Sequence, residues 1–483
     1  MRSRRQRFYR LVIVATAAGF SLLPLNASAD VQGATAPKLG LATPARSLYR
    51  AQPPAPLAYH WGPVLHSTRS IALFWVPPGF TVDAGYESTI SDFLANLAAA
   101  SGRPDNVYAA DTQYWDATGQ VTSSSTFAGA VVDTRPFPAN GCADPYTTVC
   151  LTDSQLGAEV AAQAAAGDWS ADDSTIVFLF TPEGVGSCFD QTSTTCAFRE
   201  YCAYHTWTLA SGSRRLLWAN LPYADTLPSA CDSGQHPNGT DADATLNVLG
   251  HETRETITDP YGSAWYDKAG QESSDKCAWS FGAALGTTAY GSYNQVLGSG
   301  RYYLQQEWSN ASGSCVQAYA GGAPPAPTID AVSPGQAVPG SVVTVTGTGF
   351  TGLTTAKVNG VKAAFKVLSG TSVSLTVPKT ATTGPIMVAT SWGLTTSDGS
   401  LAVQPVVNGF TPSGSAAGTT VTISGAGLGG ATSVRFNGVT APIASVSATA
   451  VKTKVPAGAT SGPISVTTAG GTASSAAAFI VTS

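Results

Sequence analysis

The residues best suited to chemistry in this sequence are His251, Glu252 and Glu255, in the run HETRE. On a helix, residues four apart lie on one face, so the imidazole of His251 and the carboxylate of Glu255 can share one cation. Glu252, one position further round, can reach the same volume and take a proton from a water molecule. The spacing therefore predicts a metal site with a general base beside it.

A helix has to position these side chains, and the segment from Thr240 to Pro260 has the signals for one. Thr240, with Asp243 three residues later, matches a capping box, and Pro260 cannot continue a helix. We therefore expect about four to five helical turns.

The same spacing is that of the zinc-peptidase helix H-E-x-x-H, with Glu255 in place of the second histidine. Two carboxylate ligands and one imidazole would neutralise a divalent ion and weaken it as a Lewis acid. A simpler interpretation stays open at this point, in which the helix is amphipathic and its polar face carries an intrahelical ion pair, such as Arg254 with a neighbouring carboxylate.

A zinc site requires a third protein ligand, and the downstream candidates are Glu272 and Asp275, followed by Asp259. The first two precede Cys277 in a loop that a disulfide would fix. With zinc, a bound water has a pKa of about 7, within reach of a carboxylate base. A solvated acidic turn and a calcium site are equally compatible with these carboxylates.

The remaining histidines give weaker indications of a functional role. His205, beside Tyr204 and Cys202, could supply a ligand or bind an oxyanion, but we favour a structural role for it. His60, His66 and His236 are interpreted as polar groups of turns or the core.

Apolar periodicity predicts the scaffold around this site. Buried strands are expected at Ser70 to Val76 and Ser174 to Phe180, and helices at Tyr86 to Ala100 and Asp153 to Ala166. Strand and helix in alternation indicate an α/β sheet with the metal-type helix laid across it. Further extended pieces are expected at Val107-Tyr108, at Gly129 to Val132 and, as a closing strand, at Tyr302 to Asn310, with a loop-rich wall of the cleft between Cys188 and Cys231.

The N-terminus has the features of an export signal. Residues 1–29 combine five arginines, an apolar stretch from Leu11 to Leu25 and the small-residue site Ala27-Ser28-Ala29. Residues 30–55, rich in Ala, Pro and Gly, are expected to form a disordered lead-in or propeptide, and whether this segment masks the site stays open. No other run is long enough to span a bilayer. A secreted, extracellular or cell-surface protein is predicted.

All eight cysteines lie between Cys142 and Cys315. An even number in an exported chain favours disulfides, and pairs of neighbours are the simplest connectivity, for example Cys142 with Cys150 and Cys277 with Cys315.

Charge narrows the range of partners. The chain has 25 basic and 30 acidic residues, so removing the five arginines of the signal leaves 20 against 30. This balance disfavours nucleic acid and anionic lipid as partners. Residues 321–483 carry only 2 of the 30 acidic side chains, so the C-terminal part is a different kind of domain.

That part contains an internal duplication. After a proline-rich linker at residues 321–327, Pro334 pairs with Pro412 and Asn359-Gly360 with Asn437-Gly438, at a constant offset of 412 − 334 = 78 residues. Short apolar runs between Gly, Asn-Gly and Pro turns indicate an antiparallel β-sandwich. Each copy, residues 328–404 and 405–483, closely resembles the immunoglobulin-like IPT/TIG domain, which implies spacing or adhesion outside the cell and no catalytic residues.

The first part resembles a known family as well. The runs GPVLHS, YCAYH, HETRETITDP and LQQEWSN, within about residues 57–318, look like secreted proteins related to the plant phosphate-induced (Exordium-like) proteins, which in bacteria are commonly fused to IPT/TIG domains. The resemblance implies a zincin-like α/β domain, at residues 56–320, and a metal-dependent hydrolase. By their positions in the motif, the residues to which this resemblance assigns the hydrolase chemistry are His251, Glu252 and Glu255.

Two functions follow as expectations. The first is a secreted, zinc-dependent, peptide-directed hydrolase in which Glu252 is the base and His251, Glu255 and Glu272 or Asp275 bind the metal. The second is a non-catalytic surface protein that binds a glycan or protein, with a structural cation. In both, the partner is an extracellular protein or a cell-wall polymer.

Overall fold

The computed structural model describes residues 39–42, 55–167, 169, 174–192, 194–210, 214–321 and 325–483. The expected signal peptide, most of the expected lead-in and residues 322–324 of the linker lie outside these ranges. Within them, no helix combines the length and the apolar character that crossing a membrane requires.

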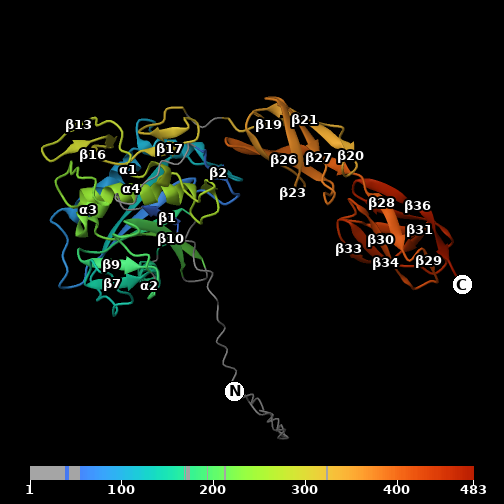
Figure 1. The fold of residues 1–483 in the computed structure, drawn as a ribbon, viewed down its shortest axis with the longest axis horizontal. Helices are drawn as coiled ribbons and strands as arrows, with labels where there is room; N and C mark the ends of the chain where they lie inside the picture. Colours follow the sequence, from blue (N-terminus) through green and yellow to red (C-terminus); the bar gives the residue numbers. More distant parts are fainter. Residues whose placement is uncertain are drawn as a thin grey trace, which may run out of the picture. The chain divides into compact units, whose positions relative to one another are not determined.

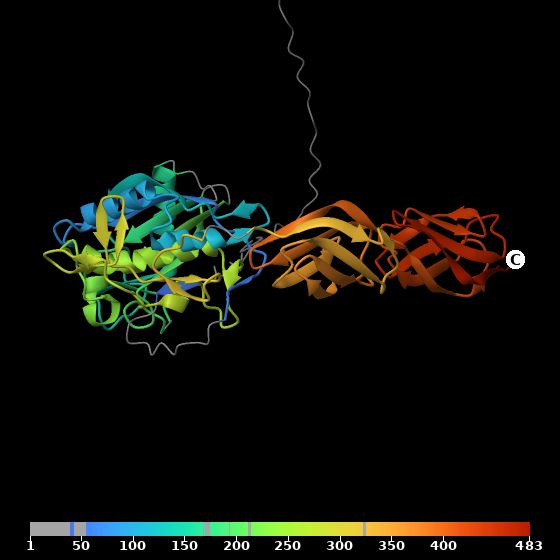
Figure 2. The same ribbon diagram turned by 90° about the horizontal axis from the view of Figure 1, so that it is seen from above.

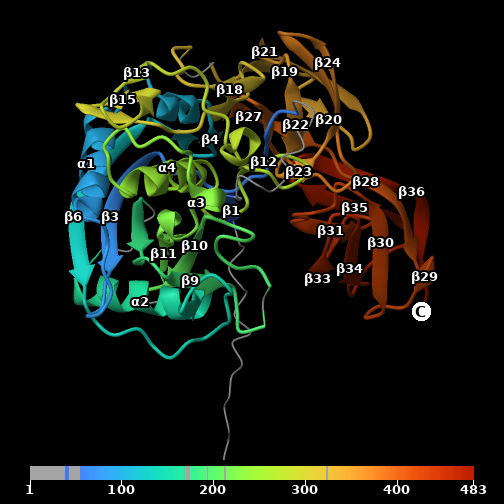
Figure 3. The ribbon, with the colours of Figure 1, turned by 60° about the vertical axis from the view of Figure 1, so that its left-hand side comes forward.

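The N-terminal domain is built on a six-stranded sheet in the order β1-β10-β11-β8-β3-β6 (Figure 3). Strands β11, β8, β3 and β6 run parallel, β10 is antiparallel to β11, and β1 is antiparallel to β10. The predicted strands from Ser70 and Ser174 are confirmed as β3 and β8. The bounds are β1 Leu39–Ala42, β3 Ser67–Trp75, β6 Ser124–Asp133, β8 Thr175–Phe180, β10 Ala203–Leu209 and β11 Arg215–Leu221. Strand β1 thus falls inside the segment expected to be disordered.

Helices cover both faces of this sheet. Neighbouring residues of β10 point to opposite faces, and Tyr204 donates a hydrogen bond to Asp153 of α2 while His205 contacts Glu252 of α4. Helix α1 packs against α4. The helices are α1 Tyr86–Ala99, α2 Asp153–Ala166, α3 Pro228–Cys231 and α4 Ala242–Thr258. The expected α/β domain with a helix laid across its sheet is therefore present (Figure 1).

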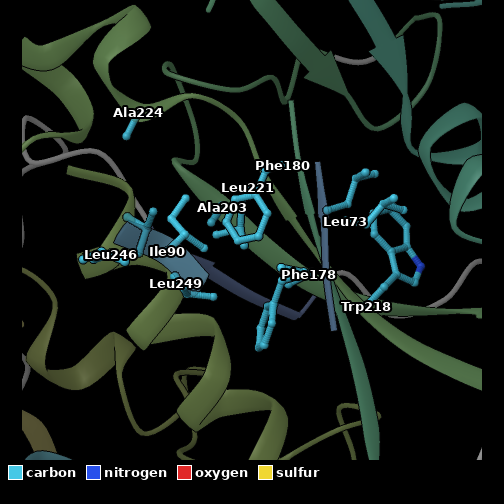
Figure 4. Close-up of a cluster of buried hydrophobic side chains, with 14 of the residues drawn as sticks. Leu73, Ile90, Phe178, Phe180, Ala203, Trp218, Leu221, Ala224, Leu246 and Leu249 are labelled. Atoms are coloured by element: carbon cyan, nitrogen blue, oxygen red, sulfur yellow. The ribbon is translucent and has the colours of Figure 1, made fainter. Parts of the chain in front are cut away.

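The core lies between the sheet and its helices. Leu246 and Leu249 of α4 are buried together with Ile90 of α1 and Phe178 of β8, in one apolar cluster (Figure 4). Burying an aliphatic or aromatic side chain of this size contributes about 1.5–3 kcal/mol. This packing fixes one side of α4, so the turns that carry its polar residues are held rigidly.

The start of α4 differs from the prediction. The helix is capped by Asp241 without a side-chain hydrogen bond, and Thr240 precedes it. The carboxylate of Asp243 accepts hydrogen bonds from the backbone N–H groups of Asn238 and Gly239 instead of closing a capping box. An acidic residue in the first turn still favours the helix through its dipole. In contrast, α2 has the complete capping box, with Thr152 as its N-cap.

Short elements complete the domain. The extended piece expected at Val107-Tyr108 is instead the start of the 3-10 helix η1, and the expected closing strand is divided between β16 and β17. The bounds are η1 Val107–Gln113, η2 Ala224–Thr226, η3 Asp275–Cys277, β2 Ala58–Tyr59, β4 Trp115–Asp116, β5 Gly119–Gln120, β7 Val149–Thr152, β9 Val185–Cys188, β12 Trp265–Tyr266, β13 Gly286–Thr287, β14 Ser292–Tyr293, β15 Gln295–Leu297, β16 Gly300–Tyr302, β17 Glu307–Ser309 and β18 Ser314–Val316.

All eight cysteines form disulfides between neighbours in the sequence, which confirms the two pairs proposed as examples. The bonds are Cys142–Cys150, Cys188–Cys196, Cys202–Cys231 and Cys277–Cys315. The last one ties η3 to β18. The end of the predicted ligand loop is therefore held covalently to β18.

Residues 325–483 form two β-sandwiches, as the duplication predicts (Figure 2). Each sandwich has a four-stranded and a five-stranded sheet. The turn residues Asn359 and Asn437 have φ of 46° and 44°, the left-handed conformation that asparagine tolerates. The strands of the first are β19 Thr328–Ser333, β20 Gln336–Ala337, β21 Val342–Thr348, β22 Leu353–Val358, β23 Val361–Lys362, β24 Ala364–Ser369, β25 Ser372–Thr376, β26 Gly384–Thr390 and β27 Gly393–Val403. Those of the second are β28 Val406–Thr411, β29 Gly414–Ser415, β30 Thr420–Ala426, β31 Ser433–Phe436, β32 Val439–Ala441, β33 Ile443–Val446, β34 Ala450–Lys454, β35 Gly462–Thr468 and β36 Gly471–Val481.

Candidate metal centre

His251 and Glu255 face each other across one turn of α4. The Nε2 atom of His251 lies 3.1 Å from Oε2 of Glu255, and both side chains are almost fully buried, with 1% and 0% exposed. Among the described residues, neither of these two atoms takes part in a hydrogen bond. Two buried groups that face only each other in this way can be held together by a shared proton or by a cation between them.

Asp275, at the start of η3, brings a third ligand atom to this pair. Its Oδ1 lies 3.6 Å from Nε2 of His251, and its backbone N–H donates a 2.8 Å hydrogen bond to Oε1 of Glu255. That bond fixes the carboxylate of Glu255 so that Oε2 points at His251. The side chain of Asp275 is 18% exposed, which makes it the one member of the three that water reaches.

The spacing of these atoms fits a small metal ion. In a tetrahedral zinc site with bonds of about 2.0–2.1 Å, two ligand atoms lie about 3.3 Å apart. The observed distances from His251 Nε2 are 3.1 Å to Glu255 and 3.6 Å to Asp275, on either side of this value. An imidazole with two carboxylates is also a typical zinc ligand set, whereas calcium takes oxygen ligands only.

Gln305, in the segment before β17, holds the ring of His251 from behind. Its side-chain amide lies 3.1 Å from Nδ1 of His251 and donates a 2.9 Å hydrogen bond to the carbonyl oxygen of Ser274. The backbone of Gln305 is held in turn by Asn247 of α4. Since the carbonyl oxygen of Ser274 can only accept, the amide nitrogen of Gln305 is the atom that faces Nδ1. Gln305 thus keeps Nε2 of His251 turned toward the two carboxylates.

A second group of possible ligands shares Glu255. His205 of β10, Glu255 and Glu272 offer atoms within 4.8 Å of one another, as His251, Glu255 and Asp275 do. The distance from His205 Nε2 to Glu272 Oε1 is 4.0 Å, longer than in the first group. Because of this difference, His251, Glu255 and Asp275 form the better site for one ion, and His205 and Glu272 flank it.

Glu252 points at His205. Its Oε2 lies 3.1 Å from Nδ1 of His205, while Nε2 of the same ring lies 3.3 Å from the carbonyl oxygen of Asp259. A histidine between two acceptors is held in a fixed orientation, with one ring nitrogen protonated toward one of them. Glu252 therefore lies next to the metal centre on the sheet side of α4.

The pKa values of the two histidines are shifted in opposite directions. Burial lowers the pKa of His205 to about 3, so this ring is neutral. Burial also lowers the pKa of His251, but the charges of Glu255 and Asp275 outweigh it and the pKa is raised overall. Burial, together with the charge of Asp275, raises the pKa of Glu255 to about 7. In the metal-free protein a proton is therefore shared in this cluster, and a cation would displace it.

The sequence-based candidates separate into three sets. His251, Glu255 and Asp275 lie together, Glu272 and Glu252 lie beside them around His205, and Asp259 has another role. One oxygen of Asp259 accepts hydrogen bonds from the backbone N–H groups of Ser263 and Ala264, which closes the turn after α4.

Two residues near this site were not among the sequence-based site residues. His205 was considered as a possible ligand with a structural role favoured, and the structure places it beside the candidate centre. Its position in a period-2 strand could have indicated that it faces the opposite way from Tyr204, toward α4. No sequence pattern indicates the role of Gln305.

The intrahelical pair of Arg254, which the sequence left open as an alternative, is not found among the described residues. Arg254 instead contacts Glu307 of β17 at 2.6 Å, and both side chains are fully buried. Ser274 connects this pair to the metal centre, because its hydroxyl hydrogen-bonds Glu307 and the backbone carbonyl of His251. The polar residues of α4 therefore belong to a tertiary network.

Comparison with known proteins agrees with this domain organisation. Residues 57–318 match the phosphate-induced protein 1 conserved region, and residues 327–401 and 405–481 each match the IPT/TIG domain. The chain is 25% identical over 253 residues to "Protein EXORDIUM-like 5" of Arabidopsis thaliana, covering 48% of this chain and 66% of that protein. The match thus spans slightly less than two thirds of the relative.

Among solved structures, a surface glycan-binding protein of Prevotella bryantii is 17% identical, with a TM-score of 0.25 over 32% of this chain and 43% of that one. The SGBP-B protein from a xyloglucan utilization locus of Bacteroides uniformis is 18% identical, with a TM-score of 0.17 over 32% and 50%. Likenesses of this size carry no information about function. From the match over residues 57–318, this chain belongs to the phosphate-induced protein 1 family and carries two IPT/TIG domains after that region.

Proposed function

We propose that this protein is an exported metal-dependent hydrolase that acts on polypeptide, with one zinc ion held by His251, Glu255 and Asp275. The observation that supports it is the convergence of two buried atoms that face each other, His251 Nε2 and Glu255 Oε2, on a third possible ligand atom at zinc-like spacing. Four disulfides in the described chain fit an oxidising compartment outside the cell.

A zinc ion in this site would supply a Lewis acid and an acidic bound water. In the proposed reaction Glu252 takes a proton from the attacking water, whose oxygen bonds to the amide carbonyl carbon. When the C–N bond breaks, Glu252 returns the proton to the leaving amine. The 3.1 Å contact with His205 orients Glu252 for this role.

The test compares Glu252→Gln with the parent protein, both prepared as the mature full chain. We expect the variant to retain zinc and to lose cleavage of an unfolded protein such as reduced casein. Glu183→Gln, at an exposed position, is the matched control and should cleave like the parent. Cleavage by Glu252→Gln at the parent rate would exclude Glu252 as the base.

The burial of the site favours a second candidate function, a non-catalytic extracellular binding protein whose cation is structural. Structural zinc sites are closed, and His251, Glu252 and Glu255 are all buried to 1% exposure or less. On this proposal the two IPT/TIG domains and the first domain bind a cell-wall polymer or another extracellular protein. Binding to whole cells would then persist in Glu252→Gln, and no cleavage would be found in the parent.

A further inference from the structure

Strand β1 lies at the edge of the sheet, next to the metal centre. It pairs antiparallel with β10, with Leu39 opposite His205 and Ala42 opposite Ala203. His205 is the residue that contacts Glu252. A segment from the N-terminal lead-in therefore runs directly alongside the strand that borders the site.

The same strand lies against the elements that carry the proposed metal ligands. β1 contacts α4, which holds His251 and Glu255, and η3, which begins with Asp275. An extended backbone thus lies beside β10 and in contact with the elements that carry the proposed ligands. All of these elements belong to one compact unit, Pro37–Ser483.

The outer edge of β10 is suited to binding a polypeptide backbone. An edge strand presents a row of N–H and C=O groups that can pair with any added strand, largely independently of its side chains. Here β1 supplies that added strand. A different polypeptide segment in the extended conformation could make the same backbone hydrogen bonds if β1 were displaced.

We propose that the outer edge of β10 is the binding site for an extended polypeptide substrate, and that Leu39–Ala42 occupies it in the uncut chain and keeps the protein latent. This deepens the proposed function and rests on it for the identity of the bound peptide as a substrate. Cutting the chain after Ala42 and losing the strand would open the site.

The first experiment weakens β1 in the full mature chain. Gly40→Pro with Leu41→Pro removes two backbone N–H groups from the strand and disfavours its pairing. The probe is a fluorescein-labelled peptide with the sequence of residues 37–44, PKLGLATP. We expect it to bind the double variant at least tenfold more tightly than the parent and more tightly than a scrambled peptide does. Ala45→Pro with Ser47→Pro, outside β1, is the control and should bind like the parent.

A second variant guards against misfolding of the first. A recognition sequence for a specific protease replaces residues 45–50, so that the protein folds with β1 attached and is cut afterwards. We expect cutting to raise the rate of zinc extraction by a chelator at least tenfold and to speed hydrogen exchange of the backbone at residues 203–205. Unchanged extraction, exchange and peptide binding after cutting would overturn the proposal and identify β1 as a structural edge strand only.

The outcomes separate this inference from the proposed function. If the peptide binds after cutting but neither form cleaves casein, β10 is a peptide-binding edge and the hydrolase proposal fails. If the uncut parent already cleaves casein as fast as the cut form, the latency proposed for β1 is wrong while the hydrolase proposal stands.

Discussion

The Nε2 atom of His251 lies 3.1 Å from Oε2 of Glu255, and within the described residues neither atom has a hydrogen-bond partner. A buried ion pair usually satisfies its remaining polar atoms with further hydrogen bonds, because the desolvation of both charges has to be offset. These two atoms instead point into a common volume that Asp275 also reaches. This relationship is the basis of the proposed cation site.

Metal binding should stabilise the protein. Because the site is assembled from α4 and η3, a ligand that binds only the folded state adds about 2.7 kcal/mol when its concentration is 100 times its dissociation constant. We expect thermal unfolding in zinc to occur several degrees above that in a chelator. The comparison uses differential scanning calorimetry, with His251→Ala as the control that should show no difference between the two conditions.

Gln305 should act on the metal through His251. Replacing a residue that orients a metal-bound histidine lowers metal affinity by about 10–100-fold. Gln305→Leu should therefore weaken zinc binding by this factor in a competition titration, while Gln306→Leu, next in the chain and bonded to Ser280, should bind zinc like the parent. Equal affinities in the two variants would show that Gln305 has only a packing role.

Removing the charge of one partner of the buried pair Arg254 and Glu307 should lower the free energy of unfolding strongly. Each single change, Arg254→Met or Glu307→Leu, leaves the other charge buried and unpaired, at a cost of about 3–5 kcal/mol. The double variant removes both charges and should recover much of this loss. Urea unfolding of the four proteins measures it, and a double variant as unstable as the sum of the singles would contradict the pairing.

Stability should also depend on pH through Glu159 of α2, far in sequence from the metal centre. Burial, together with the neighbouring Asp133, raises the pKa of Glu159 to about 7. A carboxyl whose pKa is raised in the folded state stabilises that state while it is protonated. Its contribution to the free energy of unfolding is therefore fully present below about pH 4.5 and is lost as the pH rises to about 7. Urea unfolding of Glu159→Gln should show a smaller loss of stability over this range than the parent, and Glu183→Gln should show the parent's loss.

The sequence predicted α4, two strands and two helices of the sheet domain because apolar periodicity and caps are local signals. Val107 and Tyr108 were misassigned as extended because β-branched and aromatic residues favour strands, whereas the side chain of Asn106 caps a 3-10 helix there. The single closing strand expected from Tyr302 to Asn310 is divided between β16 and β17. Leu39–Ala42 was expected to be disordered, since a four-residue strand in an Ala- and Pro-rich segment has no periodicity to detect.

For the site, spacing alone identified His251 and Glu255, because four residues make about one helical turn. The choice among Glu272, Asp275 and Asp259 could not be made from the sequence, since it depends on how the loop before Cys277 folds back on α4. The structure separates them through one hydrogen bond, from the backbone of Asp275 to Glu255. His205 comes from β10, and its alternation with Tyr204 is the one local signal of the face on which it lies.

The most direct test of this account is the zinc content of the mature full-length protein after equilibration with micromolar zinc and removal of the free ion. We predict about one zinc ion per chain in the parent and in Glu183→Gln, and less than about a tenth of that in His251→Ala and in Asp275→Ala. A parent protein that retains no zinc, or an Asp275→Ala variant that retains all of it, would contradict the site described here.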